Sequence, residues 1–422
     1  MAAPPYDLRL RAATPGLLAL PWHQQLLDWD CTEVPLRDIP VGPSRHLVRF
    51  VEADGALWAL KELPERIAVK EYTVLRDLEA RSLPAVRAAG LVIQPDDNAI
   101  LVTRFLDRSW QYRRLLMRMP RDSTEHLERL LDAMAGLLVE LHRNGVFWGD
   151  CSLANTLFSR DGQVLQAWLV DAETSEIHPR LSDGQRNHDL AILVENVAGG
   201  LLDLAIRMEQ DPDEYPELFE RAESVATRYR ALWDVLHAES NFAADDRYAV
   251  ESRVRGLQDL GFAVDEINVQ TGGDNRLRLK VAVAARRYHA DQLHDMTGLD
   301  VGEGQARILL ADLRAHEVHL QQSGPMAALR WAAEIMQPGS VRAHQALGGV
   351  GDPIQAYCDL LEVRWLLSER AQQDIGEAAA LEALAQRAAP AGSAARMAIA
   401  DAPTGQLAAL TPEMINEMSN AD

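Results

Sequence analysis

A leucine-rich helix that ends at a clear stop signal constrains this chain more than any other stretch. In "TEHLERLLDAMAGLLVELHRNG" the apolar residues recur at helical spacing and form one stripe: Leu127, Leu130, Leu131, Met134, Leu137, Leu138 and Leu141. Asp122 and Glu125 fit a capping box before the stripe, and Asn144-Gly145 fits a left-handed stop after it. The sequence therefore predicts a long buried helix with well-defined ends.

A polar turn follows this helix and is itself followed by a hairpin. In "FWGDCSLANTLF" one carboxylate, Asp150, precedes one carboxamide, Asn155, within small and apolar residues. A turn at Asp161-Gly162 then leads to the apolar run "VLQAWLVDAE", in which Asp171 follows the last apolar residue. Asp150 and Asp171 are therefore predicted at the ends of strand-like segments joined by a hairpin.

The region before the long helix mixes strands and one helix. "HLVRFVEADGALWALKEL" has two strand-like runs around Asp54-Gly55, a strong hairpin signal, and Lys61 lies near the end of the second run. "ERIAVKEYTVLRDLEARSL" then has helical spacing, and "NAILVTRFL" is typical of a buried strand. We also expect a short amphipathic helix at residues 22–30, within an N-terminal extension.

The composition excludes several classes of protein. Lys and Arg number 42 against 63 Asp and Glu, a formal charge of -21, so binding of nucleic acid through a basic surface is not expected. The three cysteines do not form a close pair, which suits a reducing cytoplasm. No window approaches about 18 uninterrupted apolar residues, so no integral membrane segment is predicted.

The second half of the chain is expected to be mainly helical. Two strands are predicted around Gly272-Gly273, with helices at 303–316 and 353–372. We place a domain boundary near residue 240. The predicted organisation is an N-terminal extension (1–35), a β-rich lobe (36–107), a helical lobe (108–240), a C-terminal accessory domain that is mainly helical α+β (241–390) and a flexible tail (391–422).

Five polar residues along the chain offer the groups that phosphoryl transfer from a nucleotide requires. The reaction needs a cation at the phosphates, oxygen ligands for a metal ion, and a carboxylate that orients or deprotonates the nucleophile. A strand lysine, a helix glutamate, a turn aspartate, an asparagine five residues later and a second aspartate supply these groups: Lys61, Glu71, Asp150, Asn155 and Asp171.

On these residues the chain, over about 40–205, resembles the protein-kinase-like superfamily in its lipopolysaccharide-kinase and aminoglycoside-phosphotransferase-like branch. The family's "HGD" or "HRD" corresponds to Trp148-Gly149-Asp150, and its "DFG" to Asp171-Ala172-Glu173. The whole chain is similar to actinobacterial proteins that join such a domain to a C-terminal domain of their own. The resemblance implies an α+β, bilobal protein-kinase-like fold, with a small β-rich lobe and a helical lobe, that uses ATP and Mg²⁺.

The resemblance also assigns roles to individual residues. It implies that Asp150 is the catalytic base, that Asn155 and Asp171 bind magnesium, and that Lys61 anchors the phosphates while Glu71 holds it. Glu65 is on the same predicted helix, so the sequence leaves open which of the two glutamates pairs with Lys61.

Two further residues are expected to support the site. Asp189 in "NHDLAIL" matches the "DLA" of related phosphotransferases, where this aspartate starts a helix and accepts hydrogen bonds from the backbone of the catalytic loop. Trp148 replaces the family's usual histidine, and we expect it to brace the loop by packing.

The predicted nucleotide-binding set is less complete around the phosphates. A glycine-rich loop is expected between the first two strands, yet "IPVGPSRHLVRF" offers only Gly42, with Ser44 and the backbone near Arg45 as further phosphate donors. We also assign Arg104, Phe105 and Leu106, at the end of the predicted strand 98–106, to nucleotide binding.

Each residue alone also has an ordinary structural explanation. Lys61 could be a charge at a sheet edge and Glu71 an exposed helix residue. Asp150 could be an ordinary turn residue, Asn155 could form an Asx turn or cap a helix, and Asp171 could end a strand. The combination, at these spacings, is much harder to explain in that way. A purely structural helical protein would require the whole set to be accidental.

The spacing after Asp171 bears on the substrate. Only 17 residues separate it from Asp189, and they contain no "APE"-like sequence, which leaves little room for a peptide-docking activation segment. We therefore predict a phosphotransferase acting on a small-molecule, sugar or lipid-linked acceptor. The alternative is a nucleotide-binding pseudokinase that acts on a protein partner through its C-terminal domain, favoured by the weak glycine loop and by Trp148.

Overall fold

The computed structural model describes most of the chain. The described residues are 6–11, 14–39, 45–117, 124–211, 215–238, 240–243, 247–271, 276–390 and 393–397. The described residues form two compact units: those within 6–159 and 167–228 belong to the first, and those within 160–166 and 229–397 belong to the second. The second unit thus includes the end of the helix at Tyr215–His237, ahead of the predicted boundary near 240.

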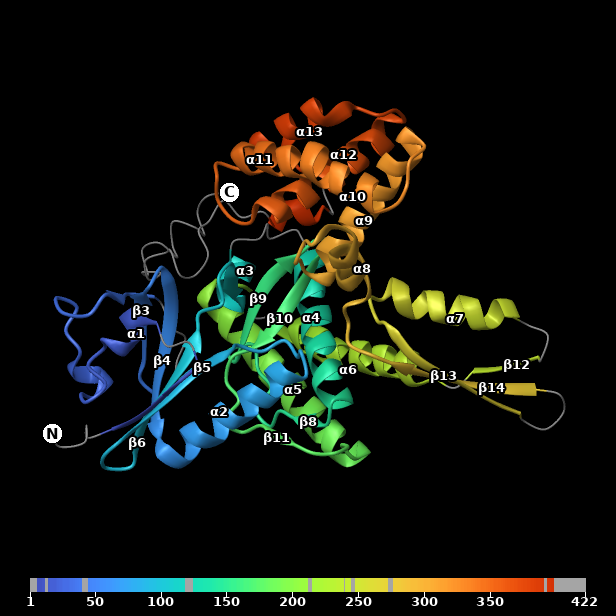
Figure 1. The fold of residues 1–422 in the computed structure, drawn as a ribbon. Helices are drawn as coiled ribbons and strands as arrows, with labels where there is room; N and C mark the ends of the chain where they lie inside the picture. The colour runs from blue at the N-terminus through green and yellow to red at the C-terminus, as the bar shows by residue number, and fades with distance from the viewer. Residues whose placement is uncertain are drawn as a thin grey trace. The chain divides into compact units, whose positions relative to one another are not determined.

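An antiparallel sheet forms the β-rich part of the first unit (Figure 1). Its strand order is β1 (Asp7–Leu10), β5 (Ala88–Gln94), β6 (Asn98–Arg104), β4 (Ala56–Pro64), β3 (Val48–Ala53) and β2 (Leu36–Arg37). Helix α2 (Glu65–Ala80) packs against this sheet with the apolar face that the sequence predicted, burying Val74, Leu75 and Leu78. The sequence did not indicate β1, β2 or β5.

The predicted hairpin at Asp54-Gly55 is confirmed. Ala53 pairs with Ala56, so the two residues between them form the whole loop. Both have positive φ, 53° for Asp54 and 73° for Gly55, as a type I′ turn requires. The turn fixes the register of β4 and therefore the direction in which its side chains point.

The predicted helix at 22–30 is wrong. The structure has a short helix α1 (Pro15–Leu18) and a single 3₁₀ turn, Leu26–Asp28, instead. Trp22 and Trp29 are buried in an edge-to-face pair with centroids 5.5 Å apart, in the cluster that covers one face of the sheet. Burial of these rings outweighs helix formation, because an extended, turning chain lets both tryptophans reach the same apolar cluster.

The helical part of the first unit carries the predicted long helix. The elements in chain order are β7 (Ser109–Gln111), α3 (Tyr112–Met117), α4 (Thr124–Arg143), β8 (Val146–Phe147), β9 (Thr156–Asp161), β10 (Val164–Leu169), β11 (Glu176–Ile177), α5 (Asp183–Arg207) and α6 (Tyr215–His237). The predicted stripe of α4 is buried. Gly145 has φ 74°, which confirms the left-handed stop, whereas the proposed cap Asp122 lies outside the described residues.

The second unit is mainly helical and contains one small sheet. The sheet has the order β12 (Ser240–Ala243), β14 (Arg276–Val283), β13 (Val264–Thr271). The helices are α7 (Arg247–Asp259), α8 (Tyr288–Thr297), α9 (Glu303–Leu320), α10 (Pro325–Trp331), a π-helix (Ala332–Met336), α11 (Gln337–Ala346), α12 (Pro353–Ala371), α13 (Gly376–Ala385) and a 3₁₀ helix (Ala394–Met397). The predicted strands are present, and Gly272-Gly273 lies outside the described residues.

Polar contacts inside the second unit fix two short pieces of chain. Asp161 accepts hydrogen bonds from the backbone of Gly304 and Gln305, each at 2.8 Å, and so caps the start of α9. Arg160 forms a bidentate pair with Asp359 at 2.7 and 2.6 Å. The residues at the tip of the β9–β10 hairpin therefore belong to this unit. The Ala394–Met397 turn, within the stretch predicted as a flexible tail, is buried there as well.

The described helices show no candidate for a membrane span, since none is both long and apolar enough to cross a bilayer.

Gly145→Ala is expected to destabilise the first unit by more than about 2 kcal/mol. An added Cβ would lie 2.0 Å from the carbonyl oxygen of His178, and φ of 74° strains any other residue. The matched control is Gly136→Ala in α4, where an added Cβ meets nothing within 4 Å. That change should raise stability slightly, by about 0.5–1 kcal/mol. Denaturant unfolding measures both variants. Equal shifts of the two unfolding midpoints from the wild-type value would contradict the predicted difference.

Candidate active site

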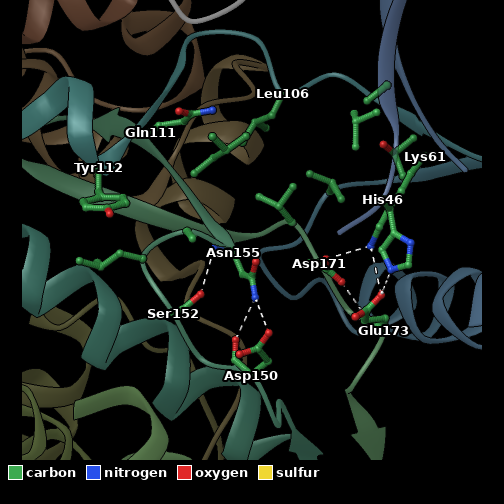
Figure 2. Close-up of a pocket in the computed structure, with 18 of the residues that line it drawn as sticks. His46, Lys61, Leu106, Gln111, Tyr112, Asp150, Ser152, Asn155, Asp171 and Glu173 are labelled. Atoms are coloured by element: carbon green, nitrogen blue, oxygen red, sulfur yellow. Dashed lines mark hydrogen bonds and ion pairs between the residues drawn. The ribbon is translucent and has the colours of Figure 1, made fainter. Parts of the chain in front are cut away.

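A cavity of about 680 Å³ in the first unit gathers most of the predicted site residues. It is lined by residues of β3, β4 and β6, by the turn after β8 and by the segment after β10. The predicted residues along it are Lys61, Glu71, Arg104, Phe105, Leu106, Asp150, Asn155 and Asp171 (Figure 2). Gly42 and Ser44 lie outside the described residues.

Lys61 is held inside this cavity by two carboxylates. Its Nζ lies 3.1 Å from Glu71 Oε2 and 2.9 Å from Asp171 Oδ2. The lysine side chain is 14% exposed and that of Glu71 only 1%. Glu65 is exposed in the first turn of α2, so Glu71 is the residue that pairs with Lys61.

Burial and charge act on this cluster in opposite directions. Burial raises the pKa of Glu71 to about 7, while the nearby Lys61 ammonium lowers it and Asp171 raises it. Burial also lowers the pKa of Lys61, but the carboxylates of Glu71 and Asp171 outweigh burial and raise it overall. Lys61 therefore stays a cation at neutral pH. Glu71 also accepts a hydrogen bond from the backbone of Ala172 at 3.2 Å, which ties α2 to the segment after β10.

Asp150 and Asn155 are joined by hydrogen bonds on another wall of the cavity (Figure 2). Asn155 Nδ2 donates to the carbonyl oxygen of Asp150 at 3.1 Å and to its Oδ2 at 3.0 Å. The backbone of Asn155 donates to Ser152 Oγ at 3.1 Å. Because the amide nitrogen is directed to Asp150, the amide oxygen is the atom that Asn155 can offer to a cation.

Asp189 is buried and holds the backbone just ahead of Asp150. Its carboxylate accepts from the backbone of Trp148 at 2.7 Å and of Gly149 at 2.8 Å. The Nε2 atom of His142 lies 3.1 Å from the same carboxylate. Asp189 lies in the second turn of α5, not at the helix start that the resemblance implied, but its contacts are those expected. His142 was missed, because one histidine near a helix end gives no distinctive sequence signal.

Trp148 joins the two halves of the site through its backbone as well as by packing. Its side chain is buried, as expected for a residue that braces the loop. Its carbonyl oxygen accepts hydrogen bonds from Thr174 Oγ1 at 2.8 Å and Ser175 Oγ at 3.2 Å. The loop that carries Asp150 is thereby fastened to the segment that follows Asp171.

Glu173 and His46, which had no predicted role, and Arg45, predicted only for the backbone near it, also lie at the cavity. Glu173 Oε2 lies 3.0 Å from His46 Nε2 and 3.7 Å from Lys61 Nζ, and its Oε1 lies 3.7 Å from Arg45. Glu173 lies where the "DFG" pattern has glycine. This difference from the family pattern was the one sequence signal that could have identified it. His46 and Arg45 carried no motif that could have identified them.

The oxygen atoms at this cavity suit a hard divalent cation. The carboxylates of Glu71, Asp171 and Glu173 each offer an oxygen, and these atoms all lie within 4.8 Å of one another. Asn155 lines the same cavity with its amide oxygen available. Carboxylate and amide oxygens are the ligands that Mg²⁺ takes in phosphoryl-transfer sites, so the residues present fit this ion.

The sheet, the helical part of the first unit and the paired lysine lie largely within a range that matches a known family. Residues 55–211 match the lipopolysaccharide kinase (Kdo/WaaP) family, which confirms the predicted resemblance over that range and supports a kinase-like phosphotransferase. Residues 231–388 match a domain of unknown function (DUF4032).

A solved structure, "WaaP in complex with acyl carrier protein", is similar to part of this chain, with 18% sequence identity and a TM-score of 0.33. The matched region spans 53% of this chain and 88% of the chain in that structure. A match at that TM-score adds no argument to the family match. No curated protein sequence matches the chain.

His142→Gln is expected to weaken the acid sensitivity of the fold. Burial lowers the pKa of His142, and Asp189 opposes this only in part. The unfolded chain therefore binds this proton more tightly, so the contribution to stability is complete above about pH 6.5 and is lost as the pH falls below it. Glutamine can place a neutral amide near Asp189 and does not titrate.

Thermal unfolding at pH 7.5 and 5.5 measures this difference. The wild-type midpoint should fall more between the two pH values than that of His142→Gln. The exposed His23→Gln serves as control and should behave like the wild type. An equal fall in all three proteins would contradict the assignment.

Proposed function

We propose that this chain is an ATP- and Mg²⁺-dependent phosphotransferase that moves the γ-phosphoryl group to a hydroxyl of a small-molecule, sugar or lipid-linked acceptor. One observation carries the proposal: a partly buried lysine paired with Glu71 and Asp171 shares a cavity with the hydrogen-bonded pair Asp150 and Asn155. The match to a lipopolysaccharide kinase family supports the same reaction class.

Nucleotide binding is assigned to the side of the cavity under the sheet. Lys61 supplies a fixed positive charge for the phosphates, and its pairing with Glu71 sets its position. Apolar side chains from the sheet and the following segment offer a surface for the base: Val48, Phe50, Ala59, Leu101, Phe105 and Leu106.

Asp171 and Asn155 are the residues assigned to hold the magnesium ion. Each can direct an oxygen atom into the cavity, and the Glu173 amide hydrogen bond to Asp171 Oδ1, at 3.2 Å, restrains that carboxylate. When bound, the ion supplies positive charge that neutralises the phosphate oxygens as the transfer proceeds.

Asp150 is placed to orient the acceptor hydroxyl. Its carboxylate is 37% exposed to the cavity, and Asn155 Nδ2 restrains it. In the proposed step a lone pair of the acceptor oxygen forms a bond to the γ-phosphorus, and the hydroxyl proton passes to Asp150. The bond between the γ-phosphorus and the bridging oxygen breaks with its electron pair remaining on ADP.

The other end of the same cavity supports the proposed acceptor class. Polar side chains from α3 and α5 line it there, including Arg113, Asn196 and Asp203. Arg113 is held by Asp203 at 2.6 Å, so this wall presents fixed hydrogen-bonding groups. Such a surface suits a hydroxyl-rich molecule more than an extended peptide, in keeping with the short segment between Asp171 and Asp189.

Asp150→Asn should lower turnover by about 10²–10⁴-fold, since the amide cannot accept the proton, and should change ATP affinity by less than about threefold. Asp171→Asn should instead abolish the gain in ATP affinity that Mg²⁺ provides. Asp183→Asn, at a side chain that is 88% exposed in the first turn of α5, removes the same charge as a control and should leave both quantities unchanged.

Titration calorimetry with ATP and Mg²⁺, together with ATP hydrolysis or autophosphorylation, tests these variants; a screen of hydroxyl acceptors then identifies the substrate. Equal turnover in the wild type and Asp150→Asn would contradict the assigned step. Nucleotide binding without any turnover would favour the pseudokinase alternative, and absence of ATP binding would exclude both.

A further inference from the structure

The Glu173 carboxylate lies where three nitrogen-bearing side chains converge. His46, Lys61 and Arg45 approach its two oxygens at 3.0, 3.7 and 3.7 Å, and its side chain is only 13% exposed. Figure 2 shows Glu173 beside His46 and Asp171, across the cavity from Asp150. A carboxylate in such surroundings occupies a position suited to an anion.

The backbone of Glu173 is fastened on both sides. Its amide donates to Asp171 Oδ1 at 3.2 Å, and its carbonyl accepts from Lys70 Nζ of α2 at 2.9 Å. The carboxylate is therefore held near the Lys61 ammonium by the fold and is not a freely moving surface charge.

The charges around Lys61 mean that the Glu173 carboxylate would affect the binding of a nucleotide. Lys61 already has two carboxylate partners, Glu71 and Asp171, before Glu173 is added. A triphosphate directed to the same ammonium would meet the repulsion of Glu173, and like charges a few ångströms apart repel appreciably at the edge of a protein. A divalent cation next to Asp171 would offset that repulsion.

We propose that Glu173 is a specificity-determining residue that competes with phosphate oxygens for Lys61, His46 and Arg45, and so makes nucleotide binding depend on the divalent metal. The inference rests on the proposed nucleotide site and adds to it a selection for the metal–nucleotide complex over the free nucleotide. A role for Glu173 as a metal ligand has the opposite consequence, because removing a ligand would weaken binding of the metal complex.

Titration calorimetry on the full chain distinguishes these roles. ATP is titrated in Mg²⁺ and again in EDTA, into the wild type and into Glu173→Gln. The variant should bind ATP in EDTA roughly tenfold more tightly than the wild type does. Its affinity in Mg²⁺ should change by less than about threefold, so that the ratio of the two dissociation constants falls.

Two controls separate charge from folding. Glu176→Gln removes the same charge three residues away, at a 57% exposed side chain that lies beside His178, and should match the wild type. Adenosine, which has no phosphate, should bind the wild type and Glu173→Gln equally. Glu173→Ala, with its thermal midpoint measured alongside, repeats the test should the glutamine variant fold poorly.

The outcomes are distinct. An unchanged ratio of ATP affinities in Glu173→Gln, or weaker binding in Mg²⁺ alone, would overturn the role proposed for Glu173 while leaving the nucleotide site intact. A wild-type chain that binds no ATP under either condition would overturn the proposed function and this inference with it.

Discussion

The pairing of the partly buried Lys61 ammonium with two carboxylates is the interaction on which the rest of the first unit depends. Removing a charged amine from water is costly, and the cost is offset only when oppositely charged partners are held close in good geometry. Glu71 on α2 and Asp171 after β10 provide these partners at 3.1 and 2.9 Å. The sheet, α2 and the segment after β10 must therefore meet at one point, and loss of either carboxylate would leave the Lys61 ammonium with only one of its two close partners.

A second set of hydrogen bonds attaches the turn that carries Asp150 to the segment that follows Asp171. Asp189 binds the backbone of Trp148 and Gly149, and the Trp148 carbonyl is bound in turn by Thr174 and Ser175. The segment after Asp171 is thus held from two sides, by Glu71 through Ala172 and by Trp148 through two hydroxyls. This fixes Asp150 relative to Asp171, which is the preorganisation that the proposed phosphoryl transfer requires, since catalysis of this kind is mostly positioning and electrostatics. Tryptophan can replace histidine at position 148 because the backbone of this residue makes the contacts, while His142 approaches Asp189 from α4.

The sequence predicted the elements whose signals are local. The Asp54-Gly55 turn, the apolar stripe of α4 and the spacing of Asp150, Asn155 and Asp171 depend on neighbouring residues, and the structure brings those side chains to one cavity. The prediction of a helix at 22–30 was wrong because burial of Trp22 and Trp29 is decided by the distant sheet. His46, His142 and Glu173 were likewise not identified, because each makes its contacts at the site with residues over forty positions away in the chain. The burial of Asp161 against α9 could not be foreseen for the same reason.

The most direct measurement is a crystal structure of the full chain with a non-hydrolysable ATP analogue and Mn²⁺, with the metal located by its anomalous scattering. We predict an anomalous peak beside the oxygens of Asp171 and Asn155, with the phosphates against Lys61 and the γ-phosphate facing Asp150. A peak elsewhere in the molecule, or a nucleotide bound outside this cavity, would contradict the proposed site.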